Sequence, residues 1–143
     1  MGVGPKIAQL PSVGSTVRVR IEVSKGGFAK RDAEGRIEFA TPIPCPYNYG
    51  SIIDTVSADG EGIDAVLLGG RVRRGELRTA TVRAVARFVD AGQDDPKVIC
   101  STQPFQSKDR VLLTLFFRIY SRVKQVKQIF DGEAGRTRFI GWL

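Results

Sequence analysis

The sequence contains no histidine, and this absence excludes several kinds of catalytic and metal site. A Ser-His-Asp triad, a Cys-His pair, an HExxH zinc site and a Cys₂His₂ finger all require histidine. Cysteine is also scarce: Cys45 and Cys100 stand far apart and form no CxxC pair, so both are expected to be free thiols. Any metal ion must therefore be held by oxygen ligands, which favours Mg²⁺, Mn²⁺ or Ca²⁺.

Long hydrophobic runs are missing as well. No apolar stretch approaches the ~20 residues of a membrane-spanning helix. The first ten residues lack the charged and apolar regions of a signal peptide. We therefore expect a cytoplasmic protein without a membrane partner, and the length of 143 residues predicts a single domain over residues 1–143.

Positive charge is present in excess, and it is unevenly placed. Residues 1–71 carry eight basic and eight acidic side chains, whereas residues 72–143 carry fourteen basic and seven acidic ones, which accounts for the net charge of +7. Most of the surplus lies in two clusters: Arg71, Arg73, Arg74, Arg78, Arg83 and Arg87, and then Arg110, Arg118, Arg122, Lys124 and Lys127. These clusters either form a solvated basic surface or attract polyanions such as nucleic acids, nucleotides or phosphate esters.

Hydrophobic periodicity predicts a chain of short strands that ends in one helix. Strands are expected at residues 17–23, 36–39, 51–53, 63–68 and 97–101, with one or two more in residues 77–89. The helix is expected over residues 109–130, with Leu112, Phe116, Ile119, Val123, Val126 and Phe130 as its buried stripe. This order favours a mostly β, α+β fold: a small barrel with the C-terminal helix packed against it.

Three carboxylates gather in the segment Asp59-Gly-Glu61-Gly-Ile-Asp64, directly before an expected strand. Like charges at this spacing raise one another's pKa unless a cation compensates them. Such a cluster is either an acidic turn or a seat for Mg²⁺.

Six short motifs in a fixed order decide between these alternatives, because together they resemble the soluble inorganic pyrophosphatases. The segment Pro46-x-Asn48-Tyr49-Gly50 lies upstream of the acidic cluster, and Asp90, Asp95 and Lys97 lie downstream with the family's spacing. The remaining motifs are Ile21-Glu22-Val23, Phe116-Phe117-x-x-Tyr120 and Gly141-Trp142. The resemblance covers most of the chain and implies a small five-stranded, OB-like barrel.

The resemblance also implies a function and a role for each matching residue. The function is Mg²⁺-dependent hydrolysis of diphosphate to two phosphates, with Mn²⁺ as a possible substitute, in a homo-oligomer that is a hexamer in bacterial members. The implied metal ligands are Asp59, Glu61, Asp64, Asp90 and Asp95, supported by Glu22. Substrate contacts are implied for Lys97, Tyr49 and Tyr120, while Glu61 accepts the proton of the attacking water and Tyr49 completes the catalytic set.

Some positions depart from the family pattern. Glu61 replaces the middle aspartate and Gly62 the proline after it, Cys45 stands where a tyrosine is expected, and Ser121 stands where a lysine is expected after Tyr120. Two phosphate-binding cations of the family have no clear counterpart: Lys25 and Lys30 are candidates for one, and Arg36 is the candidate for the other. Arg118 or Arg122 could replace the missing lysine. Two alternatives therefore stay open: a diverged member that acts on another phosphoanhydride or only binds a phosphorylated ligand, and a basic nucleic-acid-binding module.

Overall fold

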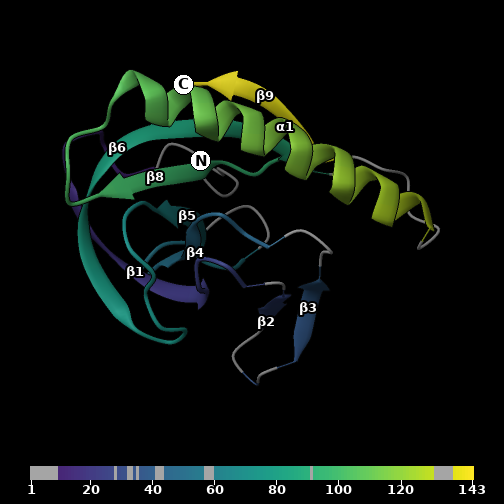
Figure 1. Ribbon diagram of the computed structural model, residues 1–143, viewed down its shortest axis with the longest axis horizontal. Coiled ribbons are helices and arrows are strands. Elements are labelled where there is room, and N and C mark those ends of the chain that lie inside the picture. The colour runs from purple at the N-terminus through teal and green to yellow at the C-terminus, as the bar shows by residue number, and fades with distance from the viewer. Residues whose placement is uncertain are drawn as a thin grey trace, which may run out of the picture.

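The computed structural model describes residues 10–27, 29–31, 34, 36–40, 44–56, 60–90, 92–130 and 137–143, and leaves aside the side chains of residues 29–31, 37–40 and 126–130. Within these ranges the chain forms strands followed by one long helix and a final strand (Figure 1). The elements are β1 (Thr16–Val23), β2 (Ala29–Arg31), β3 (Ile37–Ala40), β4 (Asn48–Ile52), β5 (Ile63–Leu67), β6 (Leu77–Asp90), β7 (Gln93–Asp94), β8 (Lys97–Ser101), α1 (Ser107–Phe130) and β9 (Arg138–Trp142).

Five of these strands form a closed ring of hydrogen-bonded pairs. The order is β1-β4-β5-β8-β6, and β6 pairs with β1 again. The β5–β8 pair is parallel, and the other four pairs in the ring are antiparallel. Strand β6 is long enough to reach beyond the ring, where β7 and β9 pair with it, while β2 and β3 form a separate two-stranded sheet. The ring and the helix confirm the predicted mostly β fold with a C-terminal helix.

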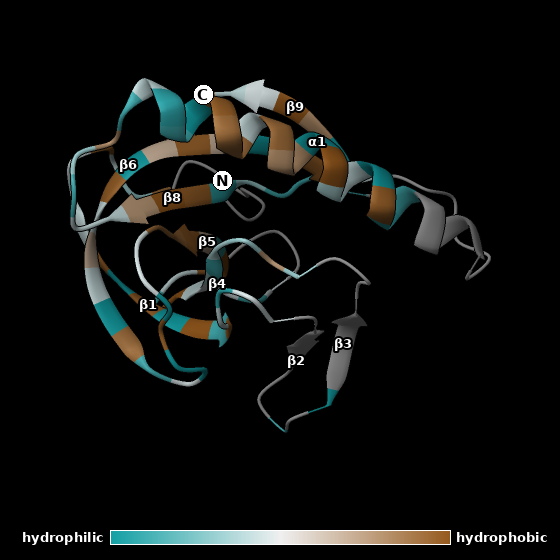
Figure 2. Ribbon diagram, in the orientation of Figure 1, coloured by the Kyte–Doolittle hydropathy of each residue, from teal (hydrophilic) through white to brown (hydrophobic). Residues whose placement is uncertain are grey.

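The ring separates two hydrophobic clusters, because side chains along a strand alternate between its faces. One cluster fills the inside of the ring and includes Ile52, Ala65 and Cys100. The other lies on the outer face beneath α1, where Val66, Ile99 and Phe88 contact the helix residues Leu113 and Phe117. Figure 2 shows the matching apolar bands on β6, β8 and α1.

A β-bulge at Glu22 interrupts this alternation on β1. Ile21 pairs with Gly50 and Val23 with Tyr49, so Glu22 is the extra residue. The bulge places Ile21 inside the ring and Val23 in the outer cluster. Bulges of this kind redirect side chains and are frequent near functional sites.

The helix differs from the sequence prediction in the face that it buries. Leu113 and Phe117 are fully buried, whereas Leu112 and Ile119 of the predicted stripe are 56% and 44% exposed. Apolar side chains cover more than one stripe of α1. The spacing of apolar residues alone therefore could not identify the face that packs on β6 and β9. The helix also begins two residues earlier than predicted, at Ser107, where Asp109 accepts a hydrogen bond from the Gln106 N–H.

The predicted strands lie at the expected positions, but β2 and β7 were not predicted and the start of β4 needs a correction. Strand β4 begins at Asn48 rather than at residue 51, because the Asn-Tyr-Gly segment pairs fully with β5. Residues 77–90 form one strand, and a bulge between Val82 and Ala84 moves Val82 inside the ring while Ala84, Ala86 and Phe88 stay outside. No helix in the described ranges has the length and apolar character needed to span a membrane.

Candidate active site

A buried lysine joins two carboxylates on the outer face of the ring. The Lys97 ammonium donates to Asp64 Oδ2 at 2.6 Å and to Asp95 Oδ2 at 2.8 Å. The parallel pairing of β5 with β8 sets Asp64 directly opposite Lys97, and Asp95 precedes Lys97 by two residues. The lysine side chain is only 3% exposed, and the two carboxylates keep 18% and 20% of their surface open to solvent. Lys97 is therefore a buried positive charge next to two carboxylates that solvent can reach.

The surroundings of Lys97 keep it charged. Burial alone would lower its pKa, but Asp64, Tyr49 and Asp95 together raise the pKa well above the usual lysine value. Burial also raises the pKa of Tyr49 well above its ordinary value, and the Asp64 carboxylate adds to that rise. At neutral pH Lys97 is therefore an ammonium and Tyr49 a protonated phenol.

Aromatic rings form the floor under this ammonium. The Lys97 nitrogen lies 5.5 Å from the ring centre of Phe88 and 5.9 Å from that of Tyr49. Tyr120 of α1 packs edge-on against Phe88, with ring centres 6.1 Å apart. The lysine side chain is thus packed against rings from β4 and β6, and these contacts restrict its rotation.

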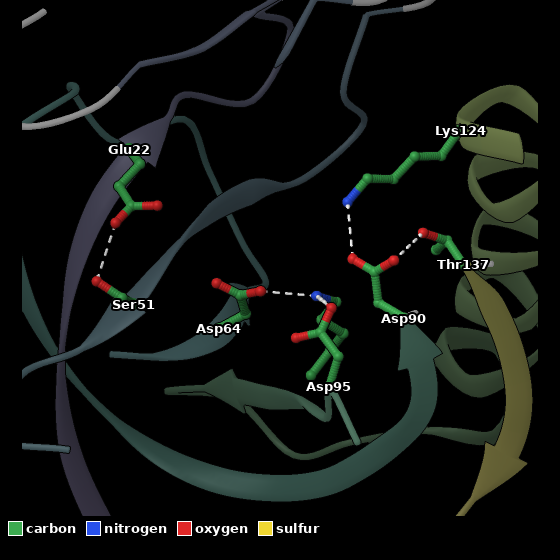
Figure 3. A network of polar contacts seen from close by, with 8 residues as sticks. Glu22, Ser51, Asp64, Asp90, Asp95, Lys124 and Thr137 are labelled. Carbon is green, nitrogen blue, oxygen red and sulfur yellow. Dashed lines mark hydrogen bonds and ion pairs between the residues drawn. The ribbon is translucent and has the colours of Figure 1, made fainter. Parts of the chain in front are cut away.

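A third carboxylate, Asp90, stands at the end of β6 between α1 and β9 (Figure 3). The Thr137 hydroxyl donates to Asp90 Oδ1 at 3.0 Å. The Lys124 ammonium lies 3.9 Å from Asp90 Oδ2 and 5.8 Å from the centre of the Tyr120 ring. Asp90 is therefore held by two neighbouring elements and remains one-third exposed.

Glu22 faces the same outer surface from β1. Its Oε2 accepts a hydrogen bond from the Ser51 hydroxyl at 3.0 Å, and Ser51 pairs with Asp64 across β4 and β5. Figure 3 shows Glu22, Asp64, Asp95 and Asp90 along one side of the strands. The β1 bulge and the pairing of β4 with β5 thus bring Glu22 to the surface that carries the aspartates.

The remaining predicted site residues are Asp59, Lys30, Glu61 and Arg36. Asp59 lies outside the described residues, and so does the side chain of Lys30. Glu61 is exposed two residues before β5, and Arg36 is exposed directly before β3. Their predicted roles stay predictions.

Several contacts at the site were missed by sequence reasoning. Lys124 lies beside Asp90, whereas Arg118 and Arg122, the suggested replacements for a missing cation, are both exposed. Ser121 is buried, and its hydroxyl accepts a hydrogen bond from the Phe139 N–H, so the position expected to hold lysine instead ties α1 to β9. The spacing of Ser121 and Lys124, three residues apart on one helix face, was the available signal.

The donor atoms of this surface suit a hard divalent cation. They are carboxylate oxygens, whereas Cys100 lies inside the ring and the Cys45 thiol donates to the carbonyl of Tyr47. Both cysteines are free, as predicted. Among the described residues, no three acidic or cysteine side chains converge closely enough to hold an ion by themselves. The donor chemistry fits Mg²⁺ or Mn²⁺.

Taken together, the fold and the site define an acidic surface with a buried lysine on the outer face of a five-strand ring. The model of the inorganic pyrophosphatase family matches residues 13–138. The chain belongs to the inorganic pyrophosphatase family.

Individual proteins agree with this assignment. The chain is 29% identical over 103 residues to an inorganic pyrophosphatase of Neisseria meningitidis and 27% identical over 103 residues to that of Haemophilus influenzae. Each match covers 68% of this chain and 58% of the relative, so the chain spans little more than half the length of these curated relatives. The crystal structure of an inorganic pyrophosphatase from Neisseria gonorrhoeae matches with a TM-score of 0.73 at 23% identity, over 90% of this chain and 82% of that one. This likeness establishes the fold.

Proposed function

We propose that the protein hydrolyses inorganic diphosphate to two phosphates with the help of Mg²⁺, and that Mn²⁺ can replace it. The observation that carries the proposal is the buried Lys97 ammonium between Asp64 and Asp95, in a chain of the pyrophosphatase family. Such a group binds a phosphate oxygen, while carboxylates beside it bind the cation that accompanies diphosphate.

The proposed metal ligands are Asp59, Glu61, Asp64, Asp90 and Asp95. Glu22 supports them from the neighbouring strand, where the Ser51 hydroxyl holds its carboxylate. When bound, the metal ions supply positive charge against the substrate oxygens and make a water molecule more acidic.

The chain itself supplies positioning and charge. Lys97 is fixed over the Phe88 and Tyr49 rings, so its ammonium meets a phosphate without further ordering. Tyr49, protonated at neutral pH, can donate a hydrogen bond to the substrate, and Tyr120 is the second phenol proposed to bind it. Lys124, beside Asp90, is the second ammonium near this surface.

Proton transfer is assigned to Glu61. Its exposed carboxylate can accept the proton of the attacking water. The chain contains no histidine that could act as the base instead. In-line attack on phosphorus needs positioning and charge stabilisation more than a covalent intermediate, so the residues present suffice. Lys30 and Arg36 remain candidates for further phosphate contacts.

The test is phosphate release from diphosphate by the purified protein, with Mg²⁺ or Mn²⁺ and with EDTA. We expect release that depends on the metal and stops with EDTA. Asp95→Asn should lower the rate about 10- to 100-fold, because it removes a charge that contacts Lys97. Its neighbour Asp94 is exposed, so Asp94→Asn is a matched control that should stay within about twofold of the wild type.

The outcomes separate the alternatives. If the wild type releases no phosphate with either metal, the proposed hydrolysis is wrong. If the folded protein then binds diphosphate in a metal-dependent way, the diverged ligand-binding protein is the better description. Nucleic-acid binding that falls steeply with salt and ignores EDTA would favour the basic module instead.

We further propose that the protein is a cytoplasmic homo-oligomer, a hexamer by resemblance to bacterial members of the family. An exposed apolar face on α1 supports self-association: Val111, Leu112, Leu115 and Ile119 are 68%, 56%, 57% and 44% exposed. Contiguous apolar side chains on a helix surface are typical of a protein interface.

A further inference from the structure

A hollow lined by arginines lies apart from the residues of the proposed active site. It has a volume of about 500 Å³ and is lined by Ser24, Arg71, Arg73, Arg74, Glu76 and Arg78. Four of these six side chains carry positive charge, and they are the first four arginines of the first basic cluster seen in the sequence. The diphosphate chemistry described above does not use any of them.

The residues that line the hollow carry a net positive charge, because four arginines and one glutamate sum to about +3. Glu76 accepts two hydrogen bonds from Arg78, at 2.7 Å from Nη2 and 3.1 Å from Nε. This pair is neutral as a whole. A net positive charge around one concave surface favours an anion of several charges.

A buried asparagine holds the arginine-bearing loop in place. Asn48 is fully buried; its Oδ1 accepts from the N–H groups of Val72 and Lys25, and its Nδ2 donates to the carbonyl of Gly70 at 2.8 Å. These bonds bind the start of the loop to β4 and to the end of β1. The loop backbone is thus fixed before any ligand arrives, which lowers the entropy cost of binding.

Further contacts hold the rest of the loop in place. Val72 is buried inside the ring, and its carbonyl accepts from the Ser24 hydroxyl at 2.6 Å. Gly75, with a φ of +91°, turns the chain back so that its N–H donates to Ile21 at 2.7 Å. Hydrogen bonds at Gly70, Val72 and Gly75 thus tie the loop backbone to the rest of the fold. Its arginine side chains are exposed.

Strand β4 separates this hollow from the proposed active site. Asn48 and Tyr49 are adjacent on the strand, so their side chains lie on opposite faces. Tyr49 belongs to the outer cluster beside Lys97, whereas Asn48 holds the arginine loop. Asp64, Asp95 and Lys97 do not line the hollow.

We propose that the hollow is a second anion site, which binds an inorganic oligophosphate of three or more phosphate groups. Arginine forks match phosphate oxygens in pairs, and several arginines around one hollow suit a ligand with several phosphates. None of the six lining residues is aromatic or large and apolar, so the site recognises phosphate groups and has no surface for a nucleobase. The volume lies within the range of small-molecule sites.

The test is titration calorimetry with tripolyphosphate in EDTA, so that no turnover occurs and the result does not depend on the proposed activity. Arg71→Gln/Arg74→Gln should raise the Kd at least about tenfold. A hydrogen bond between charged groups changes a binding constant by roughly one order of magnitude or more. Arg118→Gln/Arg122→Gln removes the same charge from exposed positions on α1 and should change the Kd less than about twofold. Citrate, a polyanion without phosphate, should bind the wild type at least about tenfold more weakly.

Each result bears directly on the proposal. Both double variants should keep the wild-type Tm, because they leave the Asn48 anchor intact, and a selective loss of affinity in Arg71→Gln/Arg74→Gln supports the site. Equal weakening in both double variants would show diffuse attraction to a basic surface and overturn it. Unchanged affinity in Arg71→Gln/Arg74→Gln would place the bound anion elsewhere, and this too would overturn it.

Discussion

Replacing Lys97 by methionine should destabilise the metal-free protein by about 3 kcal/mol. Methionine keeps the length and the apolar stem of lysine but removes the ammonium that contacts Asp64 at 2.6 Å and Asp95 at 2.8 Å. Breaking a buried ion pair costs about 3–5 kcal/mol, because a charge is left without compensation. Since the two carboxylates are 18% and 20% exposed, water solvates them in part and the lower end of that range applies.

Divalent cations should reverse part of this loss. In Lys97→Met the two carboxylates no longer have an ammonium between them, so a cation gains more by binding there than it does in the wild type. A ligand that binds only the folded state stabilises it by RT ln(1 + [L]/Kd), which is about 2.7 kcal/mol at a hundredfold excess over Kd. Mg²⁺ should therefore raise the Tm of the variant more than that of the wild type.

Thermal unfolding followed by circular dichroism, with EDTA and with Mg²⁺, measures both effects. For a chain of this length about 3 kcal/mol corresponds to a fall in Tm of roughly 10 °C. Lys124→Met is the control: its ammonium lies 3.9 Å from a partly exposed Asp90, so the expected loss is below about 1 kcal/mol. If Lys97→Met melts with the wild type and responds to Mg²⁺ identically, the ammonium does not compensate the two carboxylates.

Three further changes test other parts of the structure. Glu61→Gln should nearly abolish phosphate release while Glu61→Asp preserves or raises it, because an amide cannot accept a proton; equal activity in Glu61→Gln and the wild type would remove Glu61 as the base. Ser121→Lys should lower the Tm, since it buries an ammonium and deletes the acceptor for the Phe139 N–H, at a cost of about 1–3 kcal/mol; an unchanged melting curve would contradict that contact. Leu115→Gln on the exposed face of α1 should lower the mass measured by light scattering, and an unchanged oligomer would place the interface elsewhere.

The positions of the strands could be predicted from the sequence, because alternation records which face of each strand is buried. Val19 and Ile21 on β1 illustrate this, and so does the buried run that begins at Ile63. The helix face could not be predicted in the same way. Leu113 is selected over Leu112 only by contact with β6 and β9, which are distant in the sequence from each other.

The residue types of the site could also be anticipated, but their contacts could not. The motifs indicated Asp64, Asp95 and Lys97 as members of one site. That Lys97 lies between the two aspartates follows from the parallel pairing of β5 with β8. Strand β6 lies between these strands in the sequence, so no local pattern records their register.

Ser121 stands where a lysine is expected from the family pattern. In this chain Ser121 contacts β9, and the nearby Lys124 supplies the positive charge instead. The Ser121 hydroxyl holds β9 through the Phe139 N–H, and this contact is buried, so a long charged side chain would have no room there. Three residues later on the same helix face, Lys124 extends to Asp90 and over the Tyr120 ring. Asp90 is in turn fixed by the Thr137 hydroxyl next to β9. We therefore expect a change that loosens the docking of β9 on α1 to displace Lys124 from Asp90 as well.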